Sequence, residues 1–280
     1  MNFLATMAAS SAQRVAAARL CQPIEELRAY VRDLPPPPRW VPSREGFDLI
    51  AEVKWRSPAA GMLRPASSAD LDARVASYAQ AGAAAISVLT EPSRFDGSLD
   101  HLRAVVTSLS MRGTSPPVMR KDFLVDPYQL LEARASGAGG VLLIVRMLDA
   151  GTLASLIEGA REQQLFVLLE VFDEVDVEQA LTALEPRRSA LDDQVLIGVN
   201  CRDLSTLQVV PSRLESMIRH LPREFPRVAE SGVSTPEDAR RLAAVGYDAA
   251  LVGSALMSAE HPQELAQALL RSGRSARSGG

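Results

Sequence analysis

Short, almost unbroken apolar runs recur along the chain, and amphipathic stretches long enough for helices separate them. Strands that are buried on both faces of a parallel sheet are apolar throughout, so each run predicts such a strand. The predicted strands are residues 49–54, 84–90, 118–123, 141–145, 166–171, 195–200, 227–231 and 249–254. The apolar spacing between them predicts helices over residues 70–81, 98–108, 127–136, 149–163, 174–184, 211–220 and 235–244.

Regular alternation of strand and helix predicts parallel βαβ units and an α/β fold. Eight units within 280 residues fit a closed (β/α)8, or TIM, barrel better than an open sheet, although the count alone leaves the open sheet as an alternative. We place the barrel at residues 49–270. Residues 1–48 form an N-terminal extension, with helical apolar spacing over 12–33 followed by a stiff run of four prolines. Residues 271–280, rich in Ser, Gly and Arg, are predicted to be disordered.

Composition narrows the function classes. A net charge of −4 does not suggest a nucleic-acid surface, so local charges must hold any anionic substrate. The longest apolar runs are far too short to span a bilayer. Two cysteines cannot build a disulfide framework, which favours the cytoplasm. Residues 1–24 hold arginine, alanine and serine but no acid, which leaves an organelle-targeting segment as the less favoured alternative.

Polar residues gather where the predicted strands end. They are Glu52 and Lys54, then 120–122, Glu170, Asn200 with Arg202, and Glu230 with Ser231. One such residue could belong to a structural ion pair, but five strands that share the pattern are harder to explain by structure alone. In a (β/α)8 barrel all these ends lie on the face that holds the active site.

A glycine and a serine are adjacent at the end of each of the last two predicted strands: Gly232 comes after Ser231, and Gly253 comes before Ser254. A turn with a helix cap explains either pair alone. Both stand at the place where (β/α)8 barrels often bind phosphate. Glycine lets the backbone come close to a ligand there, and helix N-termini offer free N–H groups to an anion.

Together these residues resemble the indole-3-glycerol phosphate synthase family over roughly residues 12–270. The first signature is Leu49-Ile-Ala-Glu-Val-Lys54 with Ser57, and the second is Ile86-Ser-Val-Leu-Thr-Glu91 with Phe95. The most specific are Arg120-Lys-Asp-Phe123 and Ile197-Gly-Val-Asn200 with Arg202-Asp-Leu204. Leu142-Leu-Ile-Val145, Leu169-Glu-Val171, Glu230-Ser-Gly232 and Val252-Gly-Ser254 complete the series.

The resemblance implies conversion of 1-(2-carboxyphenylamino)-1-deoxyribulose 5-phosphate into indole-3-glycerol phosphate, carbon dioxide and water, without a metal or an organic cofactor. It implies that Lys121 is the general acid, that Glu170 is the acid/base of the later steps, and that Lys54 with Glu52 orients the substrate. The other implied residues are Asn200 and Ser231 as further catalytic groups, Ser57, Arg202 and Glu230 for binding, Phe95, Leu142 and Leu251 against the aromatic ring, and Gly232, Gly253 and Ser254 at the phosphate. The expected partner is this small phosphorylated substrate, with no nucleic acid and no membrane, and the expected assembly is a monomer or a weak homodimer.

The chain departs from the family pattern at Ala59 and Ala60, where a small polar residue and a lysine are usual, and at Trp55 and Cys201. These departures leave open a paralogue that acts on a substituted anthranilate. A phosphoribosylanthranilate isomerase is a second alternative, but that enzyme needs a cysteine where the first strand here ends in Lys54. The third is a non-catalytic barrel that binds phosphosugars, which the presence of both Lys121 and Glu170 disfavours.

Overall fold

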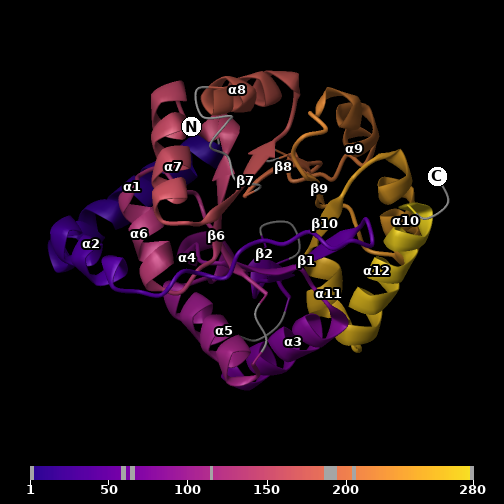
Figure 1. Cartoon of the computed structure of the whole chain (residues 1–280), viewed down its shortest axis with the longest axis horizontal. Coiled ribbons are helices and arrows are strands. Elements are labelled where there is room, and N and C mark those ends of the chain that lie inside the picture. Colours follow the sequence, from indigo (N-terminus) through magenta and orange to yellow (C-terminus); the bar gives the residue numbers. More distant parts are fainter. Residues whose placement is uncertain are drawn as a thin grey trace.

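The computed structural model describes residues 3–57, 61–63, 67–113, 116–185, 194–203 and 206–277. Eight parallel strands close into a barrel in the order β1-β10-β9-β8-β7-β6-β5-β4, so the closed alternative is confirmed (Figure 1). The strands are β1 (Asp48–Val53), β4 (Ala85–Leu89), β5 (Val118–Lys121), β6 (Gly140–Ile144), β7 (Phe166–Val171), β8 (Val195–Asn200), β9 (Arg227–Glu230) and β10 (Ala249–Val252). Each lies within one residue of its prediction at the start and within two at the end.

Helices surround the barrel on the outside (Figure 1). They are α3 (Ser68–Ala81), α5 (Leu99–Met111), α6 (Tyr128–Ala135), α7 (Ala150–Glu162), α8 (Glu174–Leu184), α9 (Ser212–Met217) with η3 (Ile218–His220), α10 (Pro236–Val245) and α12 (Pro262–Arg277). Side chains fix where several of them begin: Ser98 caps α5, Asp149 caps α7, and Thr235 forms a capping box with Asp238 at α10.

Short elements that the sequence pattern did not predict follow several strands. They are the hairpin of β2 (Arg56–Ser57) and β3 (Gly61–Met62), α4 (Pro92–Phe95), η1 (Val145–Met147) and α11 (Ser254–Ser258). All lie at the carboxyl end of the barrel, because each begins within a few residues of the end of a strand. They therefore surround the opening where the polar strand ends meet.

The barrel interior is a packed core. Its inward-facing apolar residues include Ile50, Met119, Phe166, Leu168 and Leu196, all of which are buried. A separate and larger apolar layer lies between the strands and the outer helices. At the amino end Trp40 packs against Phe166, with their ring centroids 6.0 Å apart. The polar strand ends are thus supported from below by a closed apolar core.

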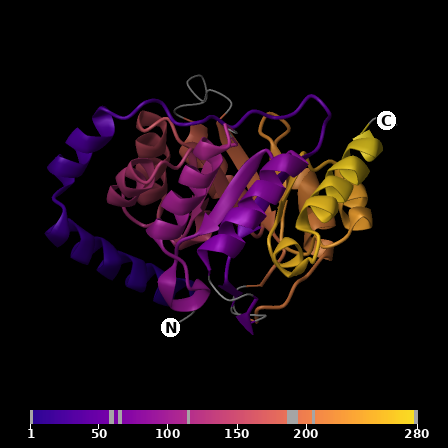
Figure 2. The ribbon, with the colours of Figure 1, turned by 90° about the horizontal axis from the view of Figure 1, so that it is seen from below.

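The N-terminal extension forms two helices, α1 (Phe3–Cys21) and α2 (Ile24–Arg32), where the spacing over 12–33 had suggested one. Pro23 separates them, since proline cannot continue a helix that precedes it. The connector after α2 crosses the amino end of the barrel, whereas the N-terminus of α1 lies near the opposite end (Figure 2). The extension therefore reaches the end that carries the polar residues.

The predicted disorder of residues 271–280 is wrong for 271–277, which continue α12 to Arg277. Arg274 donates to the carbonyl of Phe47 and pairs with Glu45, and Gly273 packs closely against the Phe47 ring. Polar composition misled the prediction because these arginines are held by partners elsewhere in the fold. Residues 278–280 lie outside the described residues. The domain boundaries at 48 and 270 stay a prediction, although α12 crosses the second.

Candidate active site

A cavity of about 460 Å³ opens at the carboxyl ends of the strands. All the site residues that the sequence predicted line it: Glu52, Lys54, Ser57, Phe95, Lys121, Leu142, Glu170, Asn200, Arg202, Glu230, Ser231, Gly232, Leu251, Gly253 and Ser254. Residues more than 200 positions apart in sequence thus meet in one place, because parallel strands bring their carboxyl ends to the same face of the barrel.

Four ionisable side chains form one layer across the top of the barrel interior. Glu52, Lys121, Glu170 and Glu230 come from β1, β5, β7 and β9, which are alternate strands of the barrel. Lys121 Nζ lies 3.2 Å from Glu170 Oε2 and 3.1 Å from Glu230 Oε2. Beside them, Lys54 Nζ lies 2.6 Å from Glu52 Oε1. Side chains of one layer in such a barrel come from alternate strands, so the fold itself brings these groups together.

Burial and mutual charge set the ionisation of this layer. Burial lowers the pKa of Lys121, but the carboxylates of Glu230, Glu170 and Glu52 outweigh it and raise that pKa well above its usual value. Burial raises the pKa of Glu230 to about 8, although Lys121 opposes the shift. Burial also acts to raise the pKa of Glu52, but Lys54 and Lys121 outweigh it and lower that pKa. The favoured state near neutral pH has a charged Lys121 and a largely protonated Glu230.

Hydrogen bonds order the polar rim on the side of β8 and β9. Asn200 Oδ1 accepts from Ser231 Oγ and from the Arg202 backbone N–H, both at 2.9 Å. Ser231 and Gly232 have φ of 66° and 69°, in the left-handed region, so the chain turns sharply after β9. This turn brings the backbone of both residues to the cavity.

Apolar side chains line the opposite side of the cavity. Phe95 ends the short helix α4, whose first turn is capped by the Glu91 carboxylate through the backbone N–H groups of Ser93 and Arg94 at 2.8 and 2.7 Å. The ring of Phe123 lies between those of Phe95 and Phe3, with centroid distances of 6.2 and 5.8 Å.

Sequence reasoning did not assign Phe3, Leu89, Phe123 or Ile144 to the site, yet all four line the cavity. Phe123 stood in the quoted third signature and could have been added. Phe3 comes from α1, and no local signal links it to a barrel strand.

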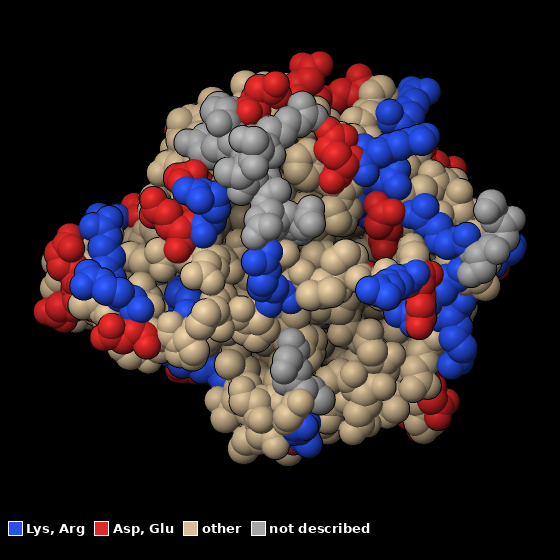
Figure 3. All heavy atoms as spheres, viewed as in Figure 1, with Lys and Arg blue, Asp and Glu red and all other residues tan. Residues whose placement is uncertain are grey.

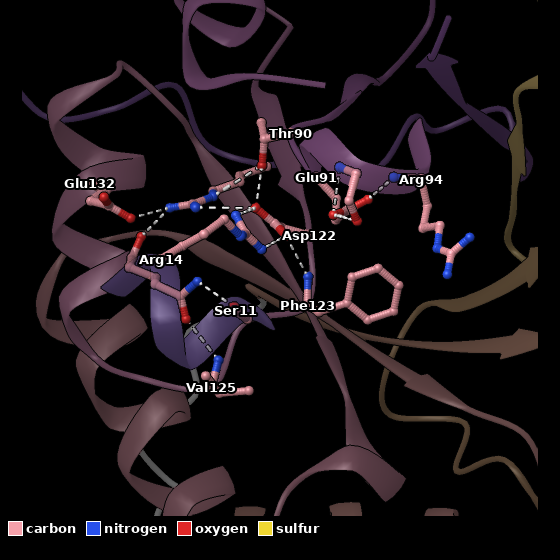
Figure 4. Close-up of polar contacts among 12 residues, drawn as sticks. Ser11, Arg14, Thr90, Glu91, Arg94, Asp122, Phe123, Val125 and Glu132 are labelled. Carbon is pink, nitrogen blue, oxygen red and sulfur yellow. Dashed lines mark hydrogen bonds and ion pairs between the residues drawn. The ribbon is translucent and has the colours of Figure 1, made fainter. Parts of the chain in front are cut away.

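A buried polar network attaches α1 to the barrel at Asp122 (Figure 4). Arg14 donates two hydrogen bonds to Asp122, at 3.0 and 2.7 Å. Asp122 also accepts from Thr90 Oγ1 at 2.7 Å and from Arg120 at 3.2 Å, and it directly follows Lys121. Burial would raise the pKa of Asp122, but Arg120 and Arg14 outweigh it and lower the pKa to about 2. The network thus fixes α1, and with it Phe3, over the apolar side of the cavity.

We expect Asp122→Asn to lower the free energy of unfolding at pH 7 by about 3 kcal/mol, because two arginines lose a buried anion. A carboxyl whose pKa falls on folding stabilises the fold above its ordinary pKa of 3.8, and that stability is lost as the pH falls through about 2. Between pH 5 and pH 2 the free energy of unfolding of the parent should therefore fall by about 2 kcal/mol more than that of the variant.

Urea unfolding across this pH range measures both effects. Asp100→Asn is the matched control, because Asp100 pairs with Arg103 on the surface of α5 and should change stability by less than about 1 kcal/mol. Equal stability of the two variants would contradict the role given to the network.

The fold and this pocket define a (β/α)8 barrel enzyme with a layer of acid–base groups across the barrel interior and aromatic rings along one side of the opening. Among solved structures the chain resembles thiamine phosphate pyrophosphorylase from Pyrococcus furiosus, with a TM-score of 0.56 at 16% identity over 83% of this chain and 98% of that one. It also resembles 3-hexulose-6-phosphate synthase from Salmonella typhimurium, with a TM-score of 0.58 at 14% identity over 80% and 97%. At such low identity these likenesses show the barrel fold alone.

Sequence comparison is more specific. The family model for indole-3-glycerol phosphate synthase matches residues 4–269. The indole-3-glycerol phosphate synthase of Salinibacter ruber is 42% identical over 82% of this chain and 79% of its own, and that of Mycobacterium leprae is 40% identical over 92% and 90%. The chain belongs to the indole-3-glycerol phosphate synthase family, which confirms the resemblance found in the sequence.

Proposed function

We propose that the chain closes the ring of 1-(2-carboxyphenylamino)-1-deoxyribulose 5-phosphate and releases carbon dioxide and water to give indole-3-glycerol phosphate. One observation carries the proposal: the ammonium of Lys121 and the carboxyl of Glu170 lie 3.2 Å apart in a cavity that also contains the glycine turns after β9 and β10. This places acid–base groups beside surfaces suited to a phosphate and to an aromatic ring.

Ring closure needs an acid. As the aromatic carbon attacks the sugar carbonyl, negative charge develops on the carbonyl oxygen, and Lys121 donates a proton to it. Loss of carbon dioxide from the ring then restores aromaticity. In the last step the hydroxyl leaves as water, and Glu170 moves the protons that this dehydration requires. A largely protonated Glu230 leaves Lys121 with one neighbouring anion fewer, which eases the release of its proton.

Binding is divided between the two sides of the cavity. Lys54, held by Glu52, orients the substrate carboxylate, while Ser57 and Arg202 contribute further contacts. Asn200 and Ser231, hydrogen-bonded to each other, support the reacting sugar hydroxyls. Gly232, Gly253 and Ser254 hold the phosphate, and Phe95, Leu142 and Leu251 pack against the anthranilate ring. Every one of these residues lines the cavity.

Incubation of the purified chain with the plain ketose phosphate tests the proposal. We expect indole fluorescence to appear with turnover, and ring-substituted substrates run in parallel measure how far the aromatic wall tolerates added groups. Faster turnover of a substituted ring would favour the specialised paralogue. Turnover of phosphoribosylanthranilate without indole formation would favour the isomerase, and binding without any product would favour a non-catalytic barrel.

We infer a small-molecule enzyme of the cytoplasm that acts as a monomer or a weak homodimer and binds no nucleic acid. No helix among the described residues is long and apolar enough to cross a membrane. On the face seen in Figure 3, basic and acidic side chains alternate without a continuous field of one sign, unlike a surface that binds nucleic acid. Cys21 and Cys201 are free thiols, as suits a reducing compartment.

A further inference from the structure

Gly198 lies in the middle of β8, between the strands that carry Glu170 and Glu230. Its backbone pairs with Glu170 on β7 and with Val228 on β9. A Cβ atom at Gly198 would lie closer than 3.0 Å to Glu230 Oε1, a separation that real Cβ atoms essentially never show. It would also lie 3.0 Å from a methyl group of Leu168. The carboxyl of Glu230 therefore occupies the space that any other residue would fill at position 198.

The backbone gives no other reason for glycine at this position. The glycines with positive φ do not include Gly198, so an L-residue could adopt its conformation. Glycine inside a strand weakens the strand and usually marks a site where another group approaches closely. At Gly198 the approaching group is the Glu230 carboxyl.

We propose that Gly198 is a positioning residue for the reaction: its missing side chain leaves the space in which the Glu230 carboxyl lies against Lys121. Glu230 Oε2 is 3.1 Å from Lys121 Nζ, while Glu230 Oε1 has no hydrogen-bond partner among the described residues. The carboxyl is thus held by its contact with Lys121 on one side and by a fitted space on the other. The inference rests on the proposed function, since it acts through the proposed general acid.

The position of the Glu230 carboxyl affects the ionisation of the other groups in the layer of Glu52, Lys121, Glu170 and Glu230. The titratable groups that interact with Glu230 are Lys121 on β5, Glu170 on β7 and Cys201 after β8. The other charged groups act on these neighbours: Glu52, the partner of Lys54 on β1, acts on Lys121, and Arg202 acts on Glu52 and Cys201. Burial raises the pKa of the Cys201 thiol, which therefore stays neutral near pH 7. A shift of the Glu230 carboxyl would therefore act chiefly on Lys121 and Glu170, the two groups it faces directly.

The same arrangement recurs across the barrel. A Cβ atom at Gly253 would lie closer than 3.0 Å to Glu52 Oε1, and Glu52 is the partner of Lys54. Gly253 directly follows β10, which pairs with β1, the strand of Glu52. In the same way Gly198 lies on β8, which pairs with β9, the strand of Glu230. In both places a glycine on the neighbouring strand, or directly after it, leaves room for a glutamate carboxyl that contacts a lysine.

Gly198→Ala tests the proposal. We expect kcat to fall roughly 10–100-fold, because a displacement of about 1 Å in a catalytic layer has effects of this size. Above about pH 8, where Glu230 is ionised, Lys121 would lose part of an anion that raises its pKa, so the alkaline limb of the pH–kcat profile should move to lower pH. Glu230→Gln, which removes the same charge, should move that limb in the same direction.

Gly140→Ala is the matched control. Gly140 also lies on a barrel strand, and a Cβ atom there would lie closer than 3.0 Å to the ring of Phe166 in the apolar interior. We expect this variant to lower Tm but to leave the pH–kcat profile unchanged. An unchanged profile in Gly198→Ala, or an equal shift in Gly140→Ala, would overturn the proposal.

A Glu230→Ala background separates steric fit from general damage. Without the Glu230 side chain, the alanine at position 198 has little to displace, so its cost in Tm and in kcat should largely disappear. If Gly198→Ala alone fails to fold, the double variant should recover folding, and equal penalties in both backgrounds would refute the inference. The Tm comparison holds even if the parent makes no indole, a result that would refute the proposed function instead.

Discussion

Replacing Lys121 with alanine should lower kcat by about 10²–10⁴-fold, the usual contribution of a well-placed general acid. Lys121 Nζ lies 3.2 Å from Glu170 Oε2 and 3.1 Å from Glu230 Oε2, and without it the carbonyl oxygen of the substrate would lose its proposed proton donor. Steady-state fluorescence of the indole product measures the loss, and circular dichroism checks that the variant is folded. Turnover near that of the parent by a folded variant would refute the assignment.

Lys121→Arg distinguishes acid catalysis from simple attraction of charge. Arginine keeps the positive charge but does not release a proton at accessible pH. If Lys121 only binds the anionic substrate, the arginine variant should retain most of the activity. If it is the acid, kcat should stay within about tenfold of the alanine variant while KM recovers.

Replacing Glu170 with glutamine should also lower kcat by about 10²–10⁴-fold, but at a later step. The amide cannot accept or deliver the protons that dehydration requires, whereas Lys121 still has Glu230 as a partner at 3.1 Å. In a single turnover we therefore expect carbon dioxide to be released ahead of the indole.

Release of labelled carbon dioxide, followed together with indole fluorescence, tests this order. In Lys121→Ala both signals should fall together, because ring closure comes before either product. Parallel loss of both signals in Glu170→Gln would contradict the division of roles between the two residues. Glu132→Gln is a suitable control, since Glu132 pairs with Arg120 outside the cavity and should leave the ratio of the two products unchanged.

The strands and most outer helices could be predicted because each depends on a local pattern of apolar residues. The elements that were missed are either very short or depend on distant contacts. The helix α4 has only four residues, and its first turn is ordered by the Glu91 carboxylate. The end of α12 looks polar in sequence, but Arg274 and Arg277 find their partners at Phe47 and Asp248.

The sequence predicted which barrel residues form the site more fully than it predicted their distant contacts and their pKa values. Lys121, Glu170 and Glu230 stand at strand ends, and a parallel barrel must bring such positions together. A sequence shows neither that Phe3 reaches the cavity from α1 nor that Arg14 binds Asp122, because no pattern links these residues. A sequence also does not show that carboxylate neighbours raise the pKa of Lys121.

The placement of the two lysines in the cavity has a practical consequence for spectroscopy. The chain has thirty basic residues, of which two are lysines, and these two, Lys54 and Lys121, both line the cavity. Reductive methylation with carbon-13 formaldehyde would therefore label only these two amines and the terminal amine. The chemical shifts of the two methylated lysines would report their ionisation directly in the intact protein, without overlapping signals from other lysines.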